Sequence, residues 1–124
     1  MPPAKILVVE NESIVALDIS NRLKRQGHHV LGLLAFGEDA VEQVATLRPD
    51  LILMDIRLQG ELDGIDAAQQ IRSRFDIPLI FLTAYSDNLT LARAEKAQPR
   101  AYLTKPFEES ELKHAIDLAL EVQR

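Results

Sequence analysis

Residues 51–64 read LILMDIRLQGELDG, an apolar run that ends in an aspartate and continues into a polar loop with two glycines. Four apolar side chains in succession, from Leu51 to Met54, are typical of a strand buried on both faces, and such strands belong to parallel sheets covered by helices. Asp55 would then lie where the strand leaves the core. An aspartate in this place often serves only as a helix cap or a turn residue, so the rest of the sequence has to distinguish that role from a chemical one.

Apolar runs of strand length also occur at residues 5–9, 29–35, 78–83 and 101–104. Helical patterns lie between and after these runs, at residues 12–26, 38–47, 65–75, 87–97 and 112–120, and the last is the clearest because its apolar residues recur at i, i+3, i+4, i+7 and i+8. This strict alternation predicts an α/β doubly wound fold of the flavodoxin-like kind. We expect a three-layer (βα)5 sandwich with a parallel sheet in the order 2-1-3-4-5.

The composition narrows the class of protein. A chain of 124 residues forms one domain, so we expect residues 1–124 to be a single unit. The chain has no cysteine, which excludes disulfides, zinc–thiolate sites and cysteine nucleophiles. A formal net charge of −5 argues against nucleic-acid binding by this chain. Neither a membrane-spanning run nor a secretory signal is evident, so we expect a cytoplasmic location with no membrane partner.

Chemically active side chains gather at the predicted carboxyl ends of the strands, the edge at which doubly wound folds bind ligands. Glu10 and Asn11 follow the first strand, Asp55 ends the third, Thr83 ends the fourth, and Lys105 follows the fifth. Each residue alone has an ordinary structural role, but together they predict a site. Clustered carboxylates repel unless a cation lies among them, and all-oxygen ligands favour Mg²⁺. Asp55 beside Mg²⁺ and an ammonium group is suited to receive a phosphoryl group.

With these residues in place, the sequence resembles the receiver domains of two-component response regulators. The resemblance rests on four motifs in the family's order and spacing, ILVVEN at 6–11, LILMDIRL at 51–58, IPLIFLTA at 77–84 and AYLTKPF at 101–107. It covers essentially the whole chain. The family would make this chain a phosphorelay component that accepts a phosphoryl group from a sensor histidine kinase or histidine phosphotransfer protein, with Mg²⁺ as its cofactor.

The resemblance also implies a role for each site residue. Asp55 would be the phosphoacceptor, and Thr83 and Lys105 would bind the phosphoryl group. The metal ligands would be Glu10, Asn11, Asp55 and the backbone carbonyl of Arg57. Thr83 and Tyr102 would form the switch, the Lys105–Pro106 peptide would be cis, and helix four, strand five and helix five would form the output surface. Such a domain is not an enzyme in the ordinary sense, because it promotes only its own phosphoryl transfer and dephosphorylation.

The chain departs from the common receiver pattern in two places. Asn11 stands where receivers usually have an aspartate, which removes one negative charge from the metal site. The loop IRLQGELDG after Asp55 is longer than the usual short turn that contains proline, and Arg57 adds a cation to it.

Two alternatives remain beside an active receiver. A small-molecule enzyme or nucleotide-binding domain on this fold is disfavoured, because the first strand–helix turn, VVENES, has no glycine and two glutamates. A pseudo-receiver that binds partners without phosphorylation is the second alternative, and metal binding would distinguish it. The sequence does not identify the kinase, the output domain or protein, or whether the chain forms a homodimer. It also leaves open whether the chain stands alone or was cut from a larger protein.

Overall fold

The computed structural model describes residues 3–84 and 87–121, in which strands and helices alternate. The strands are β1 (Lys5–Val9), β2 (His29–Leu34), β3 (Leu51–Asp55), β4 (Leu79–Thr83) and β5 (Ala101–Thr104). The helices are α1 (Ser13–Arg25), α2 (Gly37–Leu47), α3 (Gly64–Arg72), α4 (Asn88–Glu95) and α5 (Glu109–Glu121). None of these helices combines the length and apolar character needed to cross a membrane.

The five strands form one parallel sheet in the order β2-β1-β3-β4-β5, which confirms the expected doubly wound topology. The chain reverses its direction of winding between β1 and β3. Side chains at the carboxyl ends of these two strands therefore border the crevice where such sheets bind ligands.

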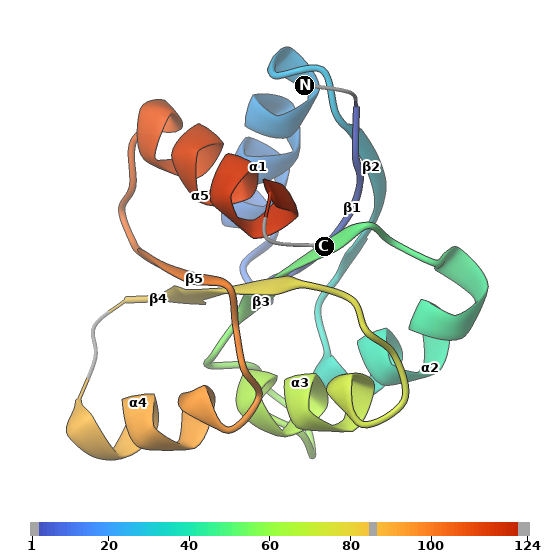
Figure 1. Ribbon diagram of the computed structural model, residues 1–124, viewed down its shortest axis with the longest axis vertical. Coiled ribbons are helices and arrows are strands. Elements are labelled where there is room, and N and C mark those ends of the chain that lie inside the picture. The colour runs from blue at the N-terminus through green and yellow to red at the C-terminus, as the bar shows by residue number, and fades with distance from the viewer. Residues whose placement is uncertain (1–2, 85–86, 122–124) are drawn as a thin grey trace.

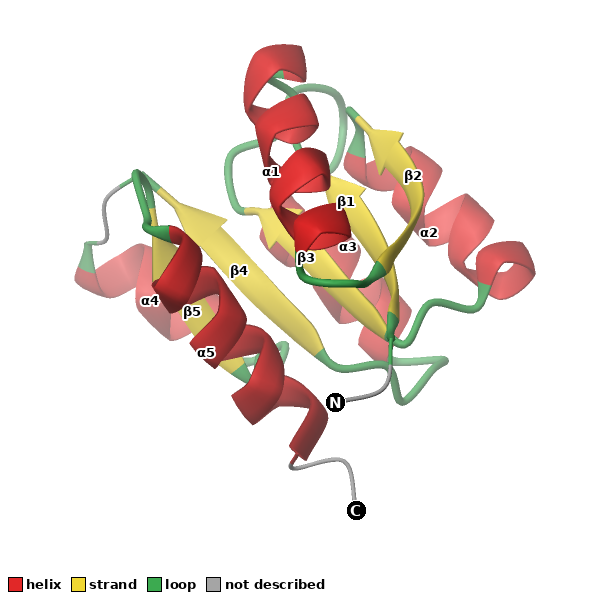
Figure 2. Cartoon of the chain, turned by 90° about the horizontal axis from the view of Figure 1, so that it is seen from above, coloured by secondary structure: helices red, strands yellow, loops and turns green. Residues whose placement is uncertain are grey.

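Helices cover both faces of the sheet, α1 and α5 on one and α2, α3 and α4 on the other (Figure 1). The view from above separates the two layers clearly, with α1 and α5 in front of the strands (Figure 2). Each layer closes a separate core, in which alternate side chains of the same strand take part: Leu7 and Val9 of β1 pack toward α2 and α3, whereas Ile6 and Val8 pack toward α1 and α5. Every residue of β3 and β4 is buried. The sheet is therefore a rigid support for the residues at its edge.

The third helix ends earlier than its apolar pattern predicts, at Arg72 instead of near Phe75. Pro78 disfavours helical backbone in the residue before it, and the chain needs an extended segment to return to β4. The Arg72 guanidinium braces this turn by donating to the Ile77 carbonyl at 3.3 Å and to Asp76 at 3.1 Å. Phe75 lies beyond the helix and still packs against the core.

Candidate functional site

Three charged side chains meet at the carboxyl edge of the sheet: Asp55 ends β3, Glu10 follows β1 directly, and Lys105 follows β5 directly. Lys105 Nζ lies 2.9 Å from Glu10 Oε1 and 3.0 Å from Asp55 Oδ2. Glu10 and Asp55 are almost completely buried, with exposed fractions of 2% and 4%. The sequence analysis placed all three residues at one site, and the structure brings them together.

Backbone hydrogen bonds that continue the sheet beyond its strands hold these residues in place. The Glu10 N–H donates to the Leu34 carbonyl at 2.9 Å, and the Lys105 N–H donates to the Thr83 carbonyl at 2.7 Å. The Glu12 N–H donates to Glu10 Oε2 at 3.1 Å, so both oxygens of this carboxylate have a donor. The Lys105–Pro106 peptide is cis, as expected from the resemblance.

Burial and charge act in opposite directions on the two partners Glu10 and Lys105. Burial raises the pKa of the Glu10 carboxyl, and the hydrogen bond from Lys105 offsets part of that increase. Burial alone would lower the pKa of Lys105, but the hydrogen bonds to Glu10 and Asp55 outweigh it, so the pKa of the ammonium lies above its ordinary value. Lys105 therefore stays charged and neutralises part of the carboxylate charge.

Thr83 and Tyr102 lie on neighbouring strands, on the side of the site that faces α4. Thr83 ends β4 and is buried, and together with Tyr102 it lines a pocket of about 370 Å³ beneath α4. The Tyr102 ring stacks on Phe81, with centroids 6.0 Å apart, and its hydroxyl donates to Glu95 Oε2 of α4 at 2.5 Å. Burial and this contact with Glu95 raise the pKa of the phenol. Thr83 and Tyr102, the two expected switch residues, therefore line the same pocket.

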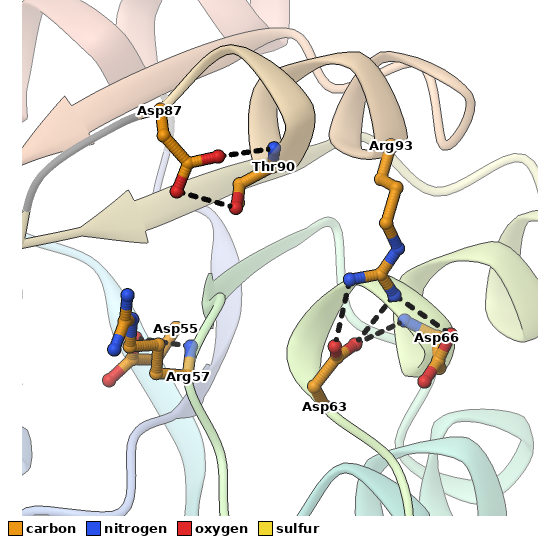
Figure 3. A network of polar contacts seen from close by, with 7 residues as sticks. All are labelled: Asp55, Arg57, Asp63, Asp66, Asp87, Thr90 and Arg93. Atoms are coloured by element: carbon orange, nitrogen blue, oxygen red, sulfur yellow. Dashed lines mark hydrogen bonds and ion pairs between the residues drawn. The ribbon is translucent and has the colours of Figure 1, made fainter.

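Arg57 begins the long loop after β3, and its backbone faces the site. Its N–H donates to Asp55 Oδ1 at 3.0 Å, and Figure 3 shows this pair. The Arg57 side chain is exposed. Its charge contributes, after hydrogen bonds from Thr90, to the lowered pKa of the Asp87 carboxyl at the start of α4.

Ion pairs that the sequence analysis missed connect the start of α3 with α4 (Figure 3). Arg93 Nη1 lies 3.2 Å from Asp63 Oδ2, and Arg93 Nη2 lies 3.1 Å from Asp66 Oδ1. Asp63 also caps α3 by accepting from the Asp66 N–H. The capping pattern was readable from sequence, but the pairing of residues about thirty positions apart was not.

The donor set of the crevice fits a hard divalent cation. Glu10 and Asp55 supply two carboxylates around one positive charge, and the half-buried Asn11 follows Glu10 directly. Within residues 3–84 and 87–121, no three histidine or acidic side chains are grouped as a metal site. A cation bound here would therefore take its remaining ligands from the Asn11 amide, the Arg57 carbonyl or water, all of which are oxygen donors that Mg²⁺ accepts.

Comparison with known sequences decides the family. The sequence model of the response regulator receiver domain matches residues 6–117. The chain belongs to the response regulator receiver domain family. This receiver domain is 38% identical over 118 residues to the transcriptional regulatory protein PdtaR of Mycobacterium tuberculosis, an alignment that covers 95% of this chain and 57% of PdtaR. The chain spans about half the length of the curated relatives it matches.

Solved structures of other receiver domains have the same fold. The signal receiver domain of a modulated diguanylate cyclase from Desulfovibrio desulfuricans G20 superimposes with a TM-score of 0.91 at 35% identity, covering 96% of this chain and 94% of that one. The receiver domain of the sensor histidine kinase PA1611 from Pseudomonas aeruginosa PAO1 has a TM-score of 0.86 at 33% identity, covering 96% and 98% of the two chains. That structure has a magnesium ion coordinated in the active site cleft.

Proposed function

We propose that this receiver domain accepts a phosphoryl group on Asp55 from a histidine kinase or histidine phosphotransfer protein in a Mg²⁺-dependent reaction, and that phosphorylation changes its affinity for an output partner. The placement of Asp55 carries the proposal. Its carboxylate ends a central, fully buried strand and accepts hydrogen bonds from the Lys105 ammonium and the Arg57 N–H. A carboxylate fixed in this way is held as a nucleophile beside the positive charge that the incoming phosphoryl group needs.

In the proposed transfer, a carboxylate oxygen of Asp55 forms a bond to phosphorus while the phosphorus–nitrogen bond to the donor histidine breaks. The leaving imidazole nitrogen takes up a proton from water. Lys105 Nζ lies 3.0 Å from Asp55 Oδ2, so it would contact the phosphoryl oxygens on that carboxylate and give up part of its pairing with Glu10. Mg²⁺, when bound by Glu10, Asn11, Asp55 and the Arg57 carbonyl, would neutralise charge on those oxygens.

The proposed switch follows from the added charge. A phosphoryl group brings about −1.5 to −2 charges and strong acceptor oxygens, to which the Thr83 hydroxyl would donate. Thr83 shares its pocket with Tyr102, so a shift of Thr83 leaves room for the Tyr102 ring. Because the Tyr102 hydroxyl is bonded to Glu95, a ring movement would break a contact with α4. This series of contacts supports an output surface that includes α4 and β5.

A groove beside the site suits a protein phosphodonor. It has a volume of about 580 Å³ and extends from Lys105 along α1, and it is lined by Ile14 and Val15 of α1 and by Phe107 from the segment after β5. Ile14 is 84% exposed, and Leu17, one turn further along α1, is also exposed. Apolar side chains this accessible and next to a reactive crevice mark an interaction site. A histidine-bearing helix seated there would reach Asp55, so we expect Ile14→Ser to slow transfer from a protein donor and to leave acetyl phosphate unaffected.

One observation favours a second candidate, a pseudo-receiver that binds partners without phosphorylation. Asn11 supplies no negative charge, and Lys105 already pairs with both carboxylates, so the charge of the crevice is partly neutralised without a metal. A Mg²⁺ titration distinguishes the candidates. Because the chain has no tryptophan to report binding by fluorescence, the titration is followed by the amide chemical shifts of residues 10–12 and 55–57. Saturable shifts at these residues favour the active receiver.

Intact mass spectrometry tests the proposed function directly. The chain is incubated with acetyl phosphate and Mg²⁺, and the matched variant Asp55→Asn, which has the same shape without the nucleophile, is treated identically. We expect a phosphoryl adduct on the wild-type chain, none on Asp55→Asn, and loss of the adduct when Mg²⁺ is chelated. An equal adduct on Asp55→Asn would refute the assignment of Asp55.

A further inference from the structure

The loop between β3 and α3, residues 56–63, is fixed at both its base and its tip. At its base, the Gly64 N–H donates to the Ile56 carbonyl at 2.9 Å. At its tip, two consecutive N–H groups, of Glu61 and Leu62, donate to the side chain of Glu38 in the first turn of α2. Gln59 also forms an isolated parallel bridge with Phe36, the residue before α2. The start of α2 therefore holds the tip of this loop.

Glu38 uses both carboxylate oxygens in this contact. Oε2 accepts from the Glu61 N–H at 3.1 Å, and Oε1 accepts from the Leu62 N–H at 3.4 Å. Gly60 lies against the same carboxylate in a left-handed conformation with φ of 98°, and a Cβ atom there would come within 2.7 Å of Glu38 Oε2. The pKa of Glu38 is lowered by hydrogen bonds from its own N–H and from those of Glu61 and Leu62. The carboxylate is thus matched to the loop in shape and charge.

The same loop carries the backbone of Arg57, which belongs to the proposed site. The Arg57 N–H orients Asp55 Oδ1 at 3.0 Å, and the Arg57 carbonyl is the expected metal ligand. Only Leu58 and Gln59 separate Arg57 from Gly60 at the tip. Without the two hydrogen bonds to Glu38, the residues of the loop tip would sample more conformations, because each freed residue regains backbone entropy. Fixing the tip therefore restricts where the Arg57 backbone lies relative to Asp55.

We infer that Glu38 is a positioning residue for phosphoryl transfer, which holds the β3–α3 loop so that the Arg57 backbone is ordered beside Asp55. The inference rests on the proposed function. Glu38 touches neither the phosphoryl group nor the metal, and it acts through the two amides of the loop tip. Groups that orient the ligands of a metal site typically change metal affinity or activity by about 10–100-fold when removed. Because Glu38 lies at the surface, we expect the lower end, about tenfold.

Three variants test this role. Glu38→Ala removes both acceptor oxygens, and Glu38→Gln keeps one acceptor oxygen and the length of the side chain. Asp39→Ala is the matched control, because it removes a carboxylate from the same first turn of α2 but from an exposed position beside the contact. The readouts are the rate of adduct formation with acetyl phosphate, the Mg²⁺ concentration at half-saturation, and hydrogen exchange at the amides of Arg57, Glu61 and Leu62.

We expect Glu38→Ala to raise the Mg²⁺ half-saturation concentration about tenfold and to slow adduct formation at low Mg²⁺. Glu38→Gln should recover part of the loss, and Asp39→Ala should match the wild-type chain. The three loop amides should exchange faster in Glu38→Ala, whereas the amides of β3 should not. This pattern separates positioning from a general loss of stability, which would speed exchange throughout the sheet.

Two results would overturn the inference and leave the proposed function in place: equal Mg²⁺ affinity and rate in Glu38→Ala and Asp39→Ala, or unchanged exchange at Glu61 and Leu62. If the wild-type chain gains no phosphoryl group, the proposed function and this inference both fail. Glu38→Gln keeps the test decisive should Glu38→Ala fail to fold.

Discussion

Replacing Lys105 by methionine tests the electrostatics of the site. Methionine keeps an unbranched, apolar chain of similar length and lacks the ammonium group. The carboxylates of Glu10 and Asp55 would then remain buried next to each other without the cation that now lies 2.9 and 3.0 Å from them. We expect Lys105→Met to be clearly less stable than the wild-type chain in the absence of metal.

The structure sets the size of this effect. Removing one partner of a buried ion pair costs about 3–5 kcal/mol, because the other charge is left without compensation. Lys105 serves two carboxylates, but its side chain is 16% exposed and water reaches the crevice, so we expect a loss of about 3 kcal/mol. For a domain of this size the corresponding fall in Tm is about 10 °C.

Urea unfolding without Mg²⁺, followed by circular dichroism, measures the loss. Lys113→Met is the matched control, because Lys113 forms an exposed i,i+4 pair with Asp117 at 3.1 Å, and exposed pairs contribute at most about 1 kcal/mol. Excess Mg²⁺ should restore part of the stability of Lys105→Met, since a ligand that binds only the folded state stabilises it. If Lys105→Met loses no more stability than Lys113→Met, Lys105 does not neutralise buried charge and the reasoning is wrong.

Three further outcomes are expected. Asn11→Asp should strengthen Mg²⁺ binding by about 1–2 kcal/mol, most at low ionic strength, and should destabilise the metal-free fold, so unchanged titrations and melts would show that Asn11 faces away from the metal. His28 accepts from the Ala4 N–H through Nδ1 at 3.0 Å, and burial lowers its pKa, so the folded state takes up a proton less readily than the unfolded one. The contribution of His28 to the free energy of unfolding should therefore be fully present above about pH 6.5 and fall below it, by at most about 1.4 kcal/mol per pH unit. His28→Asn should flatten this dependence in urea titrations at pH 7.5 and 5.5. Arg93→Ala should speed amide exchange in α4 but not in β4, because it removes the ion pairs that tie α4 to Asp63; equal exchange in both proteins would count against that tie.

The strands were predictable because their burial is continuous. The runs at 5–9, 51–55 and 101–104 coincide with β1, β3 and β5, and the other two strands differ from their predicted ranges by one residue at one end. The helix ends were harder to predict, because they depend on where the chain must turn. The end of α3 at Arg72 comes three residues before the predicted end near Phe75. By contrast, α2 ends at Leu47 as the pattern at 38–47 predicts, and Arg48 follows it in a left-handed conformation with φ of 50°.

The site residues were predictable as a set, because strand order alone brings the ends of β1, β3, β4 and β5 to one edge. The contacts among them were not. Nothing in the sequence indicates that Lys105 pairs with Glu10 as well as Asp55, or that Glu38 accepts from two loop amides. Such contacts join residues that are distant in the chain. They depend on where along its helix or strand each residue lies and on the direction of its side chain.

Gly64, the first residue of α3, should tolerate few replacements, although it contributes no reacting group. A Cβ atom on this residue would lie 1.9 Å from the carbonyl oxygen of Asp55, so no side chain fits without displacing the backbone of the proposed phosphoacceptor. Gly64 takes no part in the proposed reaction. In a saturation mutagenesis screen scored by phosphorylation, position 64 should nevertheless tolerate as few replacements as position 55, and a screen read without the structure would assign it to the reacting groups when its requirement is one of space.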